Sequence, residues 1–376
     1  MKISILKENF LRGLNIVSKA TSKSFTLPVL NNVLLSTEKN FLKISGTDLE
    51  LSIKYWALAK IEKEGAIVVP AKFLISLIGF IAEEKINIEV KNNTLHLEGK
   101  NYKNQIKGLG PEDFPIIPEV KSELNLQIDS QDLVQGLTQI VDMASSSQTR
   151  PEISGIYLCL GGDSIEMAAT DSFRLAEKKI NIPKSPSLPD KISLIVLQKT
   201  IREVINIFGE NYEKIKIFFS PNQIMFESKM KETPHPEVQI TSRLIEGEYP
   251  NYKEIIPKDF KTTATLSRQE FFNQIKAASL FSGKINEVKI KATPSQEIIE
   301  VFAQNPDLGQ SSSQMKGKIK GEKTEISFNY RFLVDGLNNI KSKEIIFELN
   351  GEDGPGVLRP VDDKNFIYVV MPIKST

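Results

Sequence analysis

The feature that most constrains the fold of this chain is a pattern that occurs three times along its 376 residues. Each copy has two runs of alternating apolar and polar residues joined by a turn and followed by a polar segment, at 33–50, 156–175 and 288–306. Alternation around a turn predicts a β-hairpin. The polar segments of the first two copies share a Thr-Asp pair, at Thr47-Asp48 and Thr170-Asp171. We therefore expect one small folding unit in three copies.

Two amphipathic helices are predicted in each copy, at residues 7–20, 70–82, 130–144, 198–208, 267–281 and 330–341. In every helix apolar residues recur at positions i, i+4 and i+7, as in Ile201, Ile205 and Phe208, which is the spacing of a buried stripe. Ser267 and Glu270 have the spacing of a capping box, which predicts where the fifth helix begins. Six matches in the same order indicate a true repeat.

Each copy closes with a further pair of strands, predicted at residues 86–98, 215–226 and 345–370. In the third copy we expect strand 345–349 to pair with strand 366–370. The borders between copies are rich in proline, at 111–118 and 250–257, which suits extended connectors. The prediction is an α+β protein of three similar domains, each with two helices packed on β-sheet, at residues 1–121, 122–258 and 259–376.

Composition favours a soluble globular protein of several domains, because 376 residues exceed one ordinary core and 40% of them are hydrophobic and 25% charged. No apolar run approaches the roughly 20 residues that cross a bilayer. The amino terminus starts directly with a strand pattern rather than a signal peptide. The single cysteine, Cys159, excludes an internal disulfide, so we expect a core position for it and a reducing, cytoplasmic location.

Residues that could support catalysis or metal binding are few. The two histidines, His96 and His235, are far apart in the repeat, so together with one cysteine they do not readily supply a zinc site. Gly-rich phosphate loops and the Gly-x-Ser-x-Gly motif are absent from the sequence. We expect no enzyme, no metal and no cofactor. A hydrolase that depends on carboxylates stays open as an alternative, because carboxylates are abundant.

Positive charge is concentrated on the predicted helices. They contain ten Lys/Arg and six Asp/Glu, a net charge of +4, against +1 for the whole chain. Two interpretations stay open: the helices have ordinary solvated faces, as in a repeat-built interaction scaffold, or they share a surface that faces a polyanion. Such a surface, without a base-reading motif, would bind phosphates in a salt-sensitive way and without sequence preference.

Over essentially its whole length the chain resembles the bacterial sliding clamp, the beta subunit of DNA polymerase III. The resemblance rests on residues 26–30, 46–50, 169–175, 248–252 and 368–373. It implies a homodimeric ring of two three-domain protomers, with sheets outside and helices around duplex DNA. It also implies a non-catalytic processivity factor that a clamp loader places on DNA and that tethers the replicative polymerase and repair or translesion polymerases. No membrane partner is expected.

In this family short linear peptides, a glutamine followed by hydrophobic residues, bind in a cleft between the second and third domains. An apolar groove with a methionine suits varied hydrophobic ligands. The positions of this chain that match the cleft are Arg150, Ile153, Thr170, Phe173, Arg174, Leu175, Pro250, Ile255, Val369, Met371, Pro372 and Ile373. Two departures bear on partner preference: Glu254 stands where relatives often carry a basic residue, and residues 231–236 resemble an insertion between strands.

The resemblance assigns residues to two further surfaces. Those expected to face DNA are Lys19, Lys23, Lys72, Lys199, Arg202 and Lys276. At the joint of the ring, the strand near Ile106 is expected to meet the first helix of the third domain near Leu280 and Phe281. The alternative for these apolar residues is a place in the internal core. A modest charge on the helices is expected to favour sliding, since tight phosphate binding would act as a brake.

Overall fold

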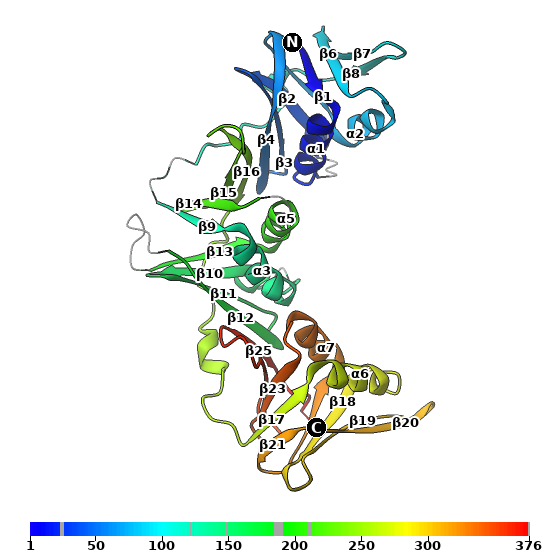
Figure 1. Ribbon diagram of the computed structural model, residues 1–376, viewed down its shortest axis with the longest axis vertical. Helices are drawn as coiled ribbons and strands as arrows, with labels where there is room; N and C mark the ends of the chain where they lie inside the picture. Colours follow the sequence, from blue (N-terminus) through cyan, green and yellow to red (C-terminus); the bar gives the residue numbers. More distant parts are fainter. Residues whose placement is uncertain are drawn as a thin grey trace. The chain divides into compact units, whose positions relative to one another are not determined.

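Antiparallel β-strands and pairs of helices make up the computed structural model, which describes residues 1–22, 26–120, 122, 124–147, 149–183, 191–209 and 212–374 (Figure 1). Contacts group these residues into two compact units. Unit 1 comprises residues 1–131 and 199–244, and unit 2 comprises residues 132–183, 191–198 and 245–374. The second sequence repeat contributes to both units.

The order strand, helix, four strands, helix, three strands occurs three times. The first repeat consists of β1 (Lys2–Leu6), α1 (Lys7–Ser18), β2 (Asn32–Glu38), β3 (Phe41–Thr47), β4 (Leu51–Lys63), β5 (Ala66–Pro70), α2 (Ala71–Phe80), β6 (Lys85–Lys91), β7 (Thr94–Glu98) and β8 (Lys103–Lys107). The second consists of β9 (Asn125–Asp129), α3 (Ser130–Ile140), a single helical turn α4 (Pro151–Ser154), β10 (Gly155–Gly161), β11 (Ser164–Thr170), β12 (Arg174–Asn181), β13 (Ile192–Leu197), α5 (Gln198–Phe208), β14 (Lys214–Phe219), β15 (Gln223–Lys229) and β16 (Pro236–Arg243). The third consists of β17 (Thr262–Ser267), α6 (Arg268–Ser279), β18 (Glu287–Thr293), β19 (Ile298–Asn305), β20 (Gly309–Lys316), β21 (Lys318–Gly321), β22 (Thr324–Asn329), α7 (Tyr330–Asn339), β23 (Glu344–Leu349), β24 (Gly356–Pro360) and β25 (Phe366–Val370). The predicted threefold repeat is confirmed, but each copy closes with three strands rather than the predicted pair, and α4 and β21 occur in one copy each.

The helices bury the predicted apolar stripes with one exception. In α5, Ile201 and Phe208 are buried as expected, but Ile205 is only partly buried and Val204 and Ile207 take its place in the core. The spacing i, i+3 and i+7 defines the buried face here, which a helix of 3.6 residues per turn permits equally well. The predicted start of α6 is confirmed, because Ser267 is its N-cap and the Ser267 hydroxyl accepts a hydrogen bond from the backbone N–H of Glu270.

Several predicted helices are too long at their carboxyl ends. Helix α2 begins at Ala71, because Pro70 is the last residue of β5, and ends at Phe80, because Ile81 has an extended backbone. Helix α3 ends at Ile140 and continues as a 3-10 turn over Val141–Met143. The helical pattern of buried residues does not show where a helix ends. Apolar residues that follow the last helical hydrogen bond, such as Ile81, can be buried in the same core.

The same backbone hydrogen bond occurs at the start of the first helix of each repeat. The backbone N–H of Lys7 donates to the carbonyl of Glu84, that of Ser130 to Glu213, and that of Arg268 to Lys343, all within 2.8–2.9 Å. The three side chains then satisfy carbonyls at the end of the second helix of the same repeat: Lys7 reaches Ile81, Ser130 reaches Phe208 at 2.7 Å, and Arg268 reaches Leu337 at 3.3 Å. Three different residue types thus supply the donors that the last carbonyls of a helix lack.

Strand pairing joins one repeat to the next. In unit 1 a twelve-stranded sheet has the order β8-β7-β6-β1-β4-β16-β15-β14-β9, with β2, β3 and β5 branching from it. In unit 2 a nine-stranded sheet has the order β13-β10-β11-β12-β25-β24-β23-β17-β21, and a four-stranded sheet has the order β20-β19-β18-β22. The pairs β4–β16 and β12–β25 cross the repeat borders, and both are antiparallel.

One predicted pairing is wrong. Residues 345–349 were expected to pair with residues 366–370, but β24 lies between β23 and β25 in the sheet, and β23 has no pairing with β25 in the described chain. The five residues of β24 contain Arg359 and end at Pro360, which conceals a short strand from pattern analysis. The closing element of every repeat is therefore three strands, β6–β8, β14–β16 and β23–β25.

A glycine in the first helix allows close packing of helix on sheet. A Cβ atom at Gly13 of α1 would lie 2.4 Å from Cδ1 of Tyr55 and 2.9 Å from Cδ1 of Ile44. Helix and strand therefore approach more closely here than any side chain on the helix would permit. Gly79 of α2 differs, because a Cβ atom there would meet nothing within 4 Å.

We predict opposite effects of alanine at these two helical glycines. Gly79→Ala should raise the free energy of unfolding by about 0.5–1 kcal/mol, since alanine favours the helix and meets no obstacle. Gly13→Ala should lower it by about 1–3 kcal/mol despite the same gain in helix propensity, because Tyr55 has to move. Urea denaturation of both variants at one protein concentration tests this, and equal effects of the two changes would contradict it.

Candidate functional site

The Thr-Asp pairs that mark the first two repeats form the same turn. The Asp48 carboxylate accepts hydrogen bonds from the backbone N–H groups of Glu50 and Leu51, and the Thr47 hydroxyl donates to the carbonyl of Leu51. In the second repeat Asp171 and Thr170 make the equivalent bonds, to Phe173 and Arg174. The residue after each aspartate has a positive φ of 78°. In the third repeat Asn305 accepts from two backbone N–H groups instead.

The second of these turns positions Arg174 at the start of β12. Its guanidinium pairs with Asp171 at 3.0 Å and with Asp335 of α7, and it lies over the ring of Phe332 at 4.9 Å from the centroid. It also donates to the carbonyl of Asp142 at 3.4 Å. Arg174 was predicted as a residue of the cleft. The structure shows it as a brace between the second and third repeats, with its donors directed at protein groups.

An apolar cluster lies under this turn, where β12 pairs with β25. Leu175 and Val369 are partners in register and belong to one buried cluster with Ala168, Val357, Ile367 and Tyr252. The Tyr252 hydroxyl donates to Glu177 at 2.6 Å, and burial followed by this carboxylate raises the pKa of Tyr252. Leu175 and Val369 are 1% exposed, so they form the floor of any groove here and its surface comes from other residues.

The remaining predicted cleft residues divide by exposure. Ile153 and Thr170 are buried, whereas Phe173 is 61% exposed and Ile255 46% exposed. Main-chain and side-chain bonds tie several of them to the turn: Met371 N–H donates to the carbonyl of Phe173 at 2.8 Å, and Arg150 donates to Ser172 at 3.1 Å. Those with intermediate exposure are Pro250, Met371, Pro372 and Ile373. The structure therefore brings the β11–β12 turn, α4 and the segment after β25 together.

Sequence reasoning missed the aromatic residues that complete this region. The Phe332 ring of α7 stacks on Phe173 with centroids 6.2 Å apart, and Tyr157, Tyr249 and Tyr252 form a second aromatic group with centroids 5.0–6.2 Å apart. The segment Tyr249-Pro250-Asn251-Tyr252 was used for the resemblance, but only Pro250 was assigned to the site. Tyr252 could have been included, because it lies only two residues after Pro250, which was assigned to the cleft. No feature of the sequence indicated Phe332.

The residues expected to face DNA are not equally available to it. Lys199 is held by Asp48 at 2.8 Å and by Glu50, and although burial opposes its charge these two carboxylates raise the pKa of Lys199. Lys19 pairs with Glu203 at 3.4 Å. Lys72, Arg202 and Lys276 are exposed, and Lys23 lies outside the described residues. The charge on the helices is therefore partly used within the fold.

A further partly buried arginine joins the first two repeats in unit 1. Arg12 of α1 donates to the Tyr212 hydroxyl at 3.0 Å and pairs with Glu237 of β16 at 3.0 Å. The Tyr55 hydroxyl donates to the same carboxylate at 3.1 Å. Burial, followed by Glu237, raises the pKa of Tyr212 to about 12. Arg12 was counted with the positive helix surface, but its charge is neutralised here.

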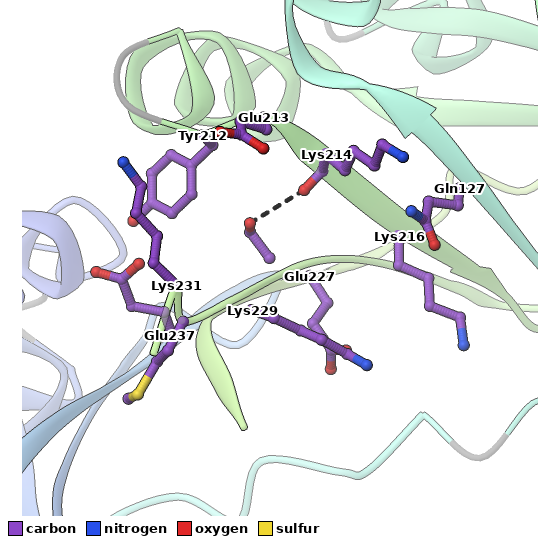
Figure 2. Close-up of a pocket in the computed structure, with 11 residues that line it drawn as sticks. Gln127, Tyr212, Glu213, Lys214, Lys216, Glu227, Lys229, Lys231 and Glu237 are labelled. Carbon is purple, nitrogen blue, oxygen red and sulfur yellow. Dashed lines mark hydrogen bonds between the residues drawn. The ribbon is translucent and has the colours of Figure 1, made fainter. Parts of the chain in front are cut away.

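Beside this cluster, at one end of the sheet β9-β14-β15-β16, is a cavity of about 450 Å³. Figure 2 shows Tyr212 and Glu237 among the residues that line it. Ser228 also belongs to the lining, and its hydroxyl donates to the carbonyl of Lys214 at 3.0 Å. Four lysines line it, Lys214, Lys216, Lys229 and Lys231, together with Glu213 and Glu227. The mixture of both charges does not select a ligand.

The predicted insertion, residues 231–236, lies between β15 and β16 and packs on the first repeat. The His235 ring stacks on Phe41 with centroids 4.2 Å apart and meets Trp56 edge-on at 5.6 Å. Its Nδ1 lies 2.7 Å from the carbonyl oxygen of Pro236. Six residues separate β15 from β16, against four between β7 and β8 and five between β24 and β25, so this connection is little longer than its equivalents. It contacts the first repeat, where its histidine has a packing role.

The three residues predicted at the ring joint lie on or beside sheet edges. Ile106 is 5% exposed on β8, Leu280 is 72% exposed after α6, and Phe281 is partly buried. In the described chain β8 pairs only with β7, and β20 only with β19. Among the described residues there is also no group of three His, Cys, Asp or Glu side chains placed to hold a metal ion, and no helix long and apolar enough to span a membrane.

The sequence matches three family models, described as the N-terminal, central and C-terminal domains of the DNA polymerase III beta subunit, over residues 1–118, 127–251 and 253–374. The chain belongs to the DNA polymerase III beta subunit family. It is 27% identical to the beta sliding clamp of Staphylococcus epidermidis, with 100% of both chains covered. The chain itself has the three-domain clamp fold, and it is a DNA sliding clamp, a processivity factor of DNA replication without a catalytic role.

Solved structures agree with this fold over the full length. The DNA polymerase sliding clamp from Bacillus subtilis has a TM-score of 0.93 at 26% identity, and the DNA polymerase III subunit beta from Pseudomonas aeruginosa has 0.92 at 25% identity. Each match covers 100% of both chains. The alternatives kept from the sequence, a carboxylate-dependent hydrolase and a scaffold without a role at DNA, are set aside.

We predict that the two arginines assigned to the cleft differ in their effect on stability. Arg174→Ala should lower the free energy of unfolding by about 2–4 kcal/mol, because it leaves Asp171 and Asp335 without their partner. Arg150→Ala should change it by no more than about 0.5 kcal/mol, because Arg150 is exposed and its contacts are at the surface. Urea denaturation measures both, and a similar loss in the two variants would contradict the assignment of Arg174 as a brace.

Proposed function

We propose that two copies of this clamp close a ring around duplex DNA and tether a polymerase there through a peptide-binding cleft. The observation that supports a ring is the strand pairing that joins each repeat to the next, which we call a joint. The fourth strand of the first repeat pairs with the last strand of the second, β4 with β16, and the fourth strand of the second repeat pairs with the last strand of the third, β12 with β25. The remaining fourth strand is β20, and the remaining last strand is β8.

A third joint of the same kind needs a second copy of the chain. Repetition of one joint yields either a closed ring or an open filament. Two copies would pair β20 of each with β8 of the other, which covers both edges and removes the sites at which a free edge invites aggregation. This arrangement makes Ile106, Leu280 and Phe281 part of the dimer interface. We propose the domain boundaries 1–121, 122–258 and 259–376 for the three copies of the repeat.

Contact with DNA in this proposal is weak and independent of sequence. Lys72, Arg202 and Lys276 would supply dispersed positive charge; Lys72 and Lys276 are exposed, whereas the ion pairs of Lys19 and Lys199 reduce theirs. Lys23 is included by the resemblance alone. Few available charges suit a sliding protein, because each phosphate contact adds to the salt-dependent affinity that slows movement. The ring, rather than affinity, would then keep the protein on DNA, and an ATP-driven clamp loader would open it. We propose the cytoplasm as its location.

The proposed cleft lies in unit 2 around the β11–β12 turn. Phe173 and Ile255 supply exposed apolar surface, and Met371, Pro372, Ile373 and Pro250 supply partly buried surface. The buried Leu175 and Val369, with Ile153 and Thr170, would form its floor. An apolar groove of this composition fits short peptides with hydrophobic residues from replicative, repair and translesion polymerases. Arg150 is the polar group at its rim, since Arg174 is held by two aspartates.

Topological binding predicts a difference between circular and linear DNA. After loading by an ATP-driven clamp loader, the protein should stay on nicked circular DNA through gel filtration in high salt and should leave once a restriction enzyme linearises the circle. Salt removes phosphate contacts but does not open a closed ring. Equal retention on both forms would exclude encirclement.

The cleft predicts loss of peptide binding without loss of the dimer. Met371→Ser and Ile255→Ser should each raise the dissociation constant of a polymerase-tail peptide by about tenfold or more, since each removes apolar contact area. Fluorescence anisotropy of a labelled peptide measures this, and light scattering checks the dimer. Ile116→Ser is the matched control, because Ile116 is 93% exposed on the connector outside the cleft. Unchanged affinity in both cleft variants would remove the assignment.

A further inference from the structure

The joint between the first two repeats has a groove that the proposed function does not use. Two cavities of unit 1 lie along the connector after β8, one of about 220 Å³ and one of about 580 Å³. Both are lined by Pro118 of the connector and by Thr241 of β16, so they adjoin. We call the two together the connector groove.

The repeat places this groove where the second joint has the proposed peptide-binding cleft. A Thr-Asp turn leads into β4 as it does into β12, and these strands pair with β16 and β25. Counted from the turns, Ser52 is equivalent to Leu175. In the ladders Ser52 faces Thr241 as Leu175 faces Val369, so the two pairs mark one position in the two joints.

The floor at this position is polar in the connector groove and apolar in the cleft. Ser52 and Thr241 supply hydroxyls where the cleft has Leu175 and Val369, and the Ser52 hydroxyl lies 2.8 Å from that of Thr47. An apolar side chain gains less free energy when it is buried on hydroxyls than on a leucine and a valine. The hydrophobic peptides proposed for the cleft therefore do not suit the connector groove.

Lys54 lines the larger cavity, two residues further along β4 from Ser52. Its side chain has no hydrogen bond or ion pair within the described part of the chain, and it is partly buried. Burial, followed by Lys43, lowers the pKa of Lys54, and Glu119 and Glu38 offset this only in part. A partly buried charge without a partner destabilises the fold, so Lys54 is placed for a ligand rather than for stability.

A second cation without a partner lines the smaller cavity. Arg243 is exposed, and its guanidinium makes no hydrogen bond or ion pair among the residues that the structure describes. Glu50 and Glu38 also line the cavities, but Glu50 is paired with Lys199 and Glu38 with Lys43. Each cavity of the connector groove therefore offers a cation to an anionic ligand.

The two cations are spaced for an extended chain. Lys54 faces Gln239 across the ladder, and Arg243 lies four residues further along β16, which is about 13 Å in a strand. Side chains four residues apart in an extended peptide lie on one face at the same spacing. Two apolar residues of the smaller cavity are also available, because Leu49 is 44% exposed and Ile116 is 93% exposed. A peptide with two carboxylates and an apolar residue matches this arrangement.

We propose that the connector groove binds an acidic linear peptide, which places one carboxylate on Lys54, another on Arg243 and an apolar side chain against Leu49 and Ile116. The hydroxyls of the floor are hydrogen-bond partners for its main chain. Charge supplies here the specificity that the cleft takes from apolar contact. The cleft enters this inference only as the equivalent position, so loss of the cleft assignment would leave the inference standing.

The first test is fluorescence anisotropy of a labelled peptide of about ten residues, with two glutamates four positions apart and a leucine between them, titrated with the full chain. The dissociation constant should be about 100 µM or lower in about 0.05 M NaCl and should rise about tenfold or more in about 0.5 M NaCl. The same peptide with glutamine in place of both glutamates should bind about tenfold more weakly, because it lacks the charge that Lys54 and Arg243 recognise.

Variants of the chain locate the bound peptide. Lys54→Met and Arg243→Gln should each raise the dissociation constant about tenfold, since each removes one charged contact. Lys85→Met removes the same charge from β6, outside both cavities, and should have no effect. Ile116→Ser should raise the constant about threefold or more through lost apolar contact, whereas Ile255→Ser in the cleft should leave it unchanged.

The stability of Lys54→Met separates a ligand-binding lysine from a structural one. An unpaired and partly buried ammonium group destabilises the fold, so methionine should raise the urea concentration at the midpoint of unfolding while it weakens peptide binding. Replacement of a lysine on which the fold depends would lower this midpoint, and that result would overturn the inference.

The remaining outcomes also decide. No binding of the acidic peptide up to about 1 mM, equal binding of the glutamine peptide, or equal effects of Lys54→Met and Lys85→Met would each overturn the inference. Displacement of the peptide by free glutamate at equal concentration would overturn it in favour of a small-anion site. A polymerase-tail peptide that binds twice per chain, with one site lost in Ile116→Ser, would overturn it in favour of a second copy of the cleft. Binding that needs the glutamates, Lys54 and Arg243 together supports it.

Discussion

Main-chain pairing between the fourth strand of one repeat and the last strand of the next is the interaction on which the rest of this structure depends. Each of the two joints within the chain is an antiparallel ladder with five residue pairs in register. Backbone hydrogen bonds do not specify side chains, so the same joint forms from different sequences. Because every repeat carries both a fourth and a last strand, the arrangement leaves one of each unused.

Side chains then fix each joint in its own way. An arginine stands at both joints within the chain: Arg12 reaches Glu237, and Arg174 reaches Asp335. In each case the carboxylate belongs to the following repeat and the guanidinium is partly buried against an aromatic ring, Tyr212 or Phe332. A planar guanidinium combines ion pairing with stacking, which a lysine does not.

The internal use of positive charge bears on how a clamp slides. Lys7 and Arg268 cap the ends of second helices, Arg12 braces a joint, and Lys199 is held by Asp48 and Glu50. The net charge of +4 on the predicted helices therefore exceeds what remains available to phosphates. A surface that offers few unpaired cations gives weak, interchangeable contacts, and this is compatible with movement along DNA once the protein is held by topology.

The sequence by itself determined the repeat, the six helices and most strands, because the periods 3.6 and 2 and the Thr-Asp turns are local and survive as residue patterns. Through the resemblance it also assigned Leu175 and Val369 to the proposed cleft and Leu280 to the proposed dimer interface. Only the tertiary structure decided that Arg174 and Lys199 are held by carboxylates, that β24 separates β23 from β25, and that Phe332 stacks on Phe173. Arg174 pairs with Asp335 and Lys199 pairs with Asp48, and in both pairs the partners are more than 100 residues apart in the chain. No local sequence pattern identifies such a partner. The sequence shows which element carries a charged residue, whereas the tertiary structure determines which groups its side chain contacts.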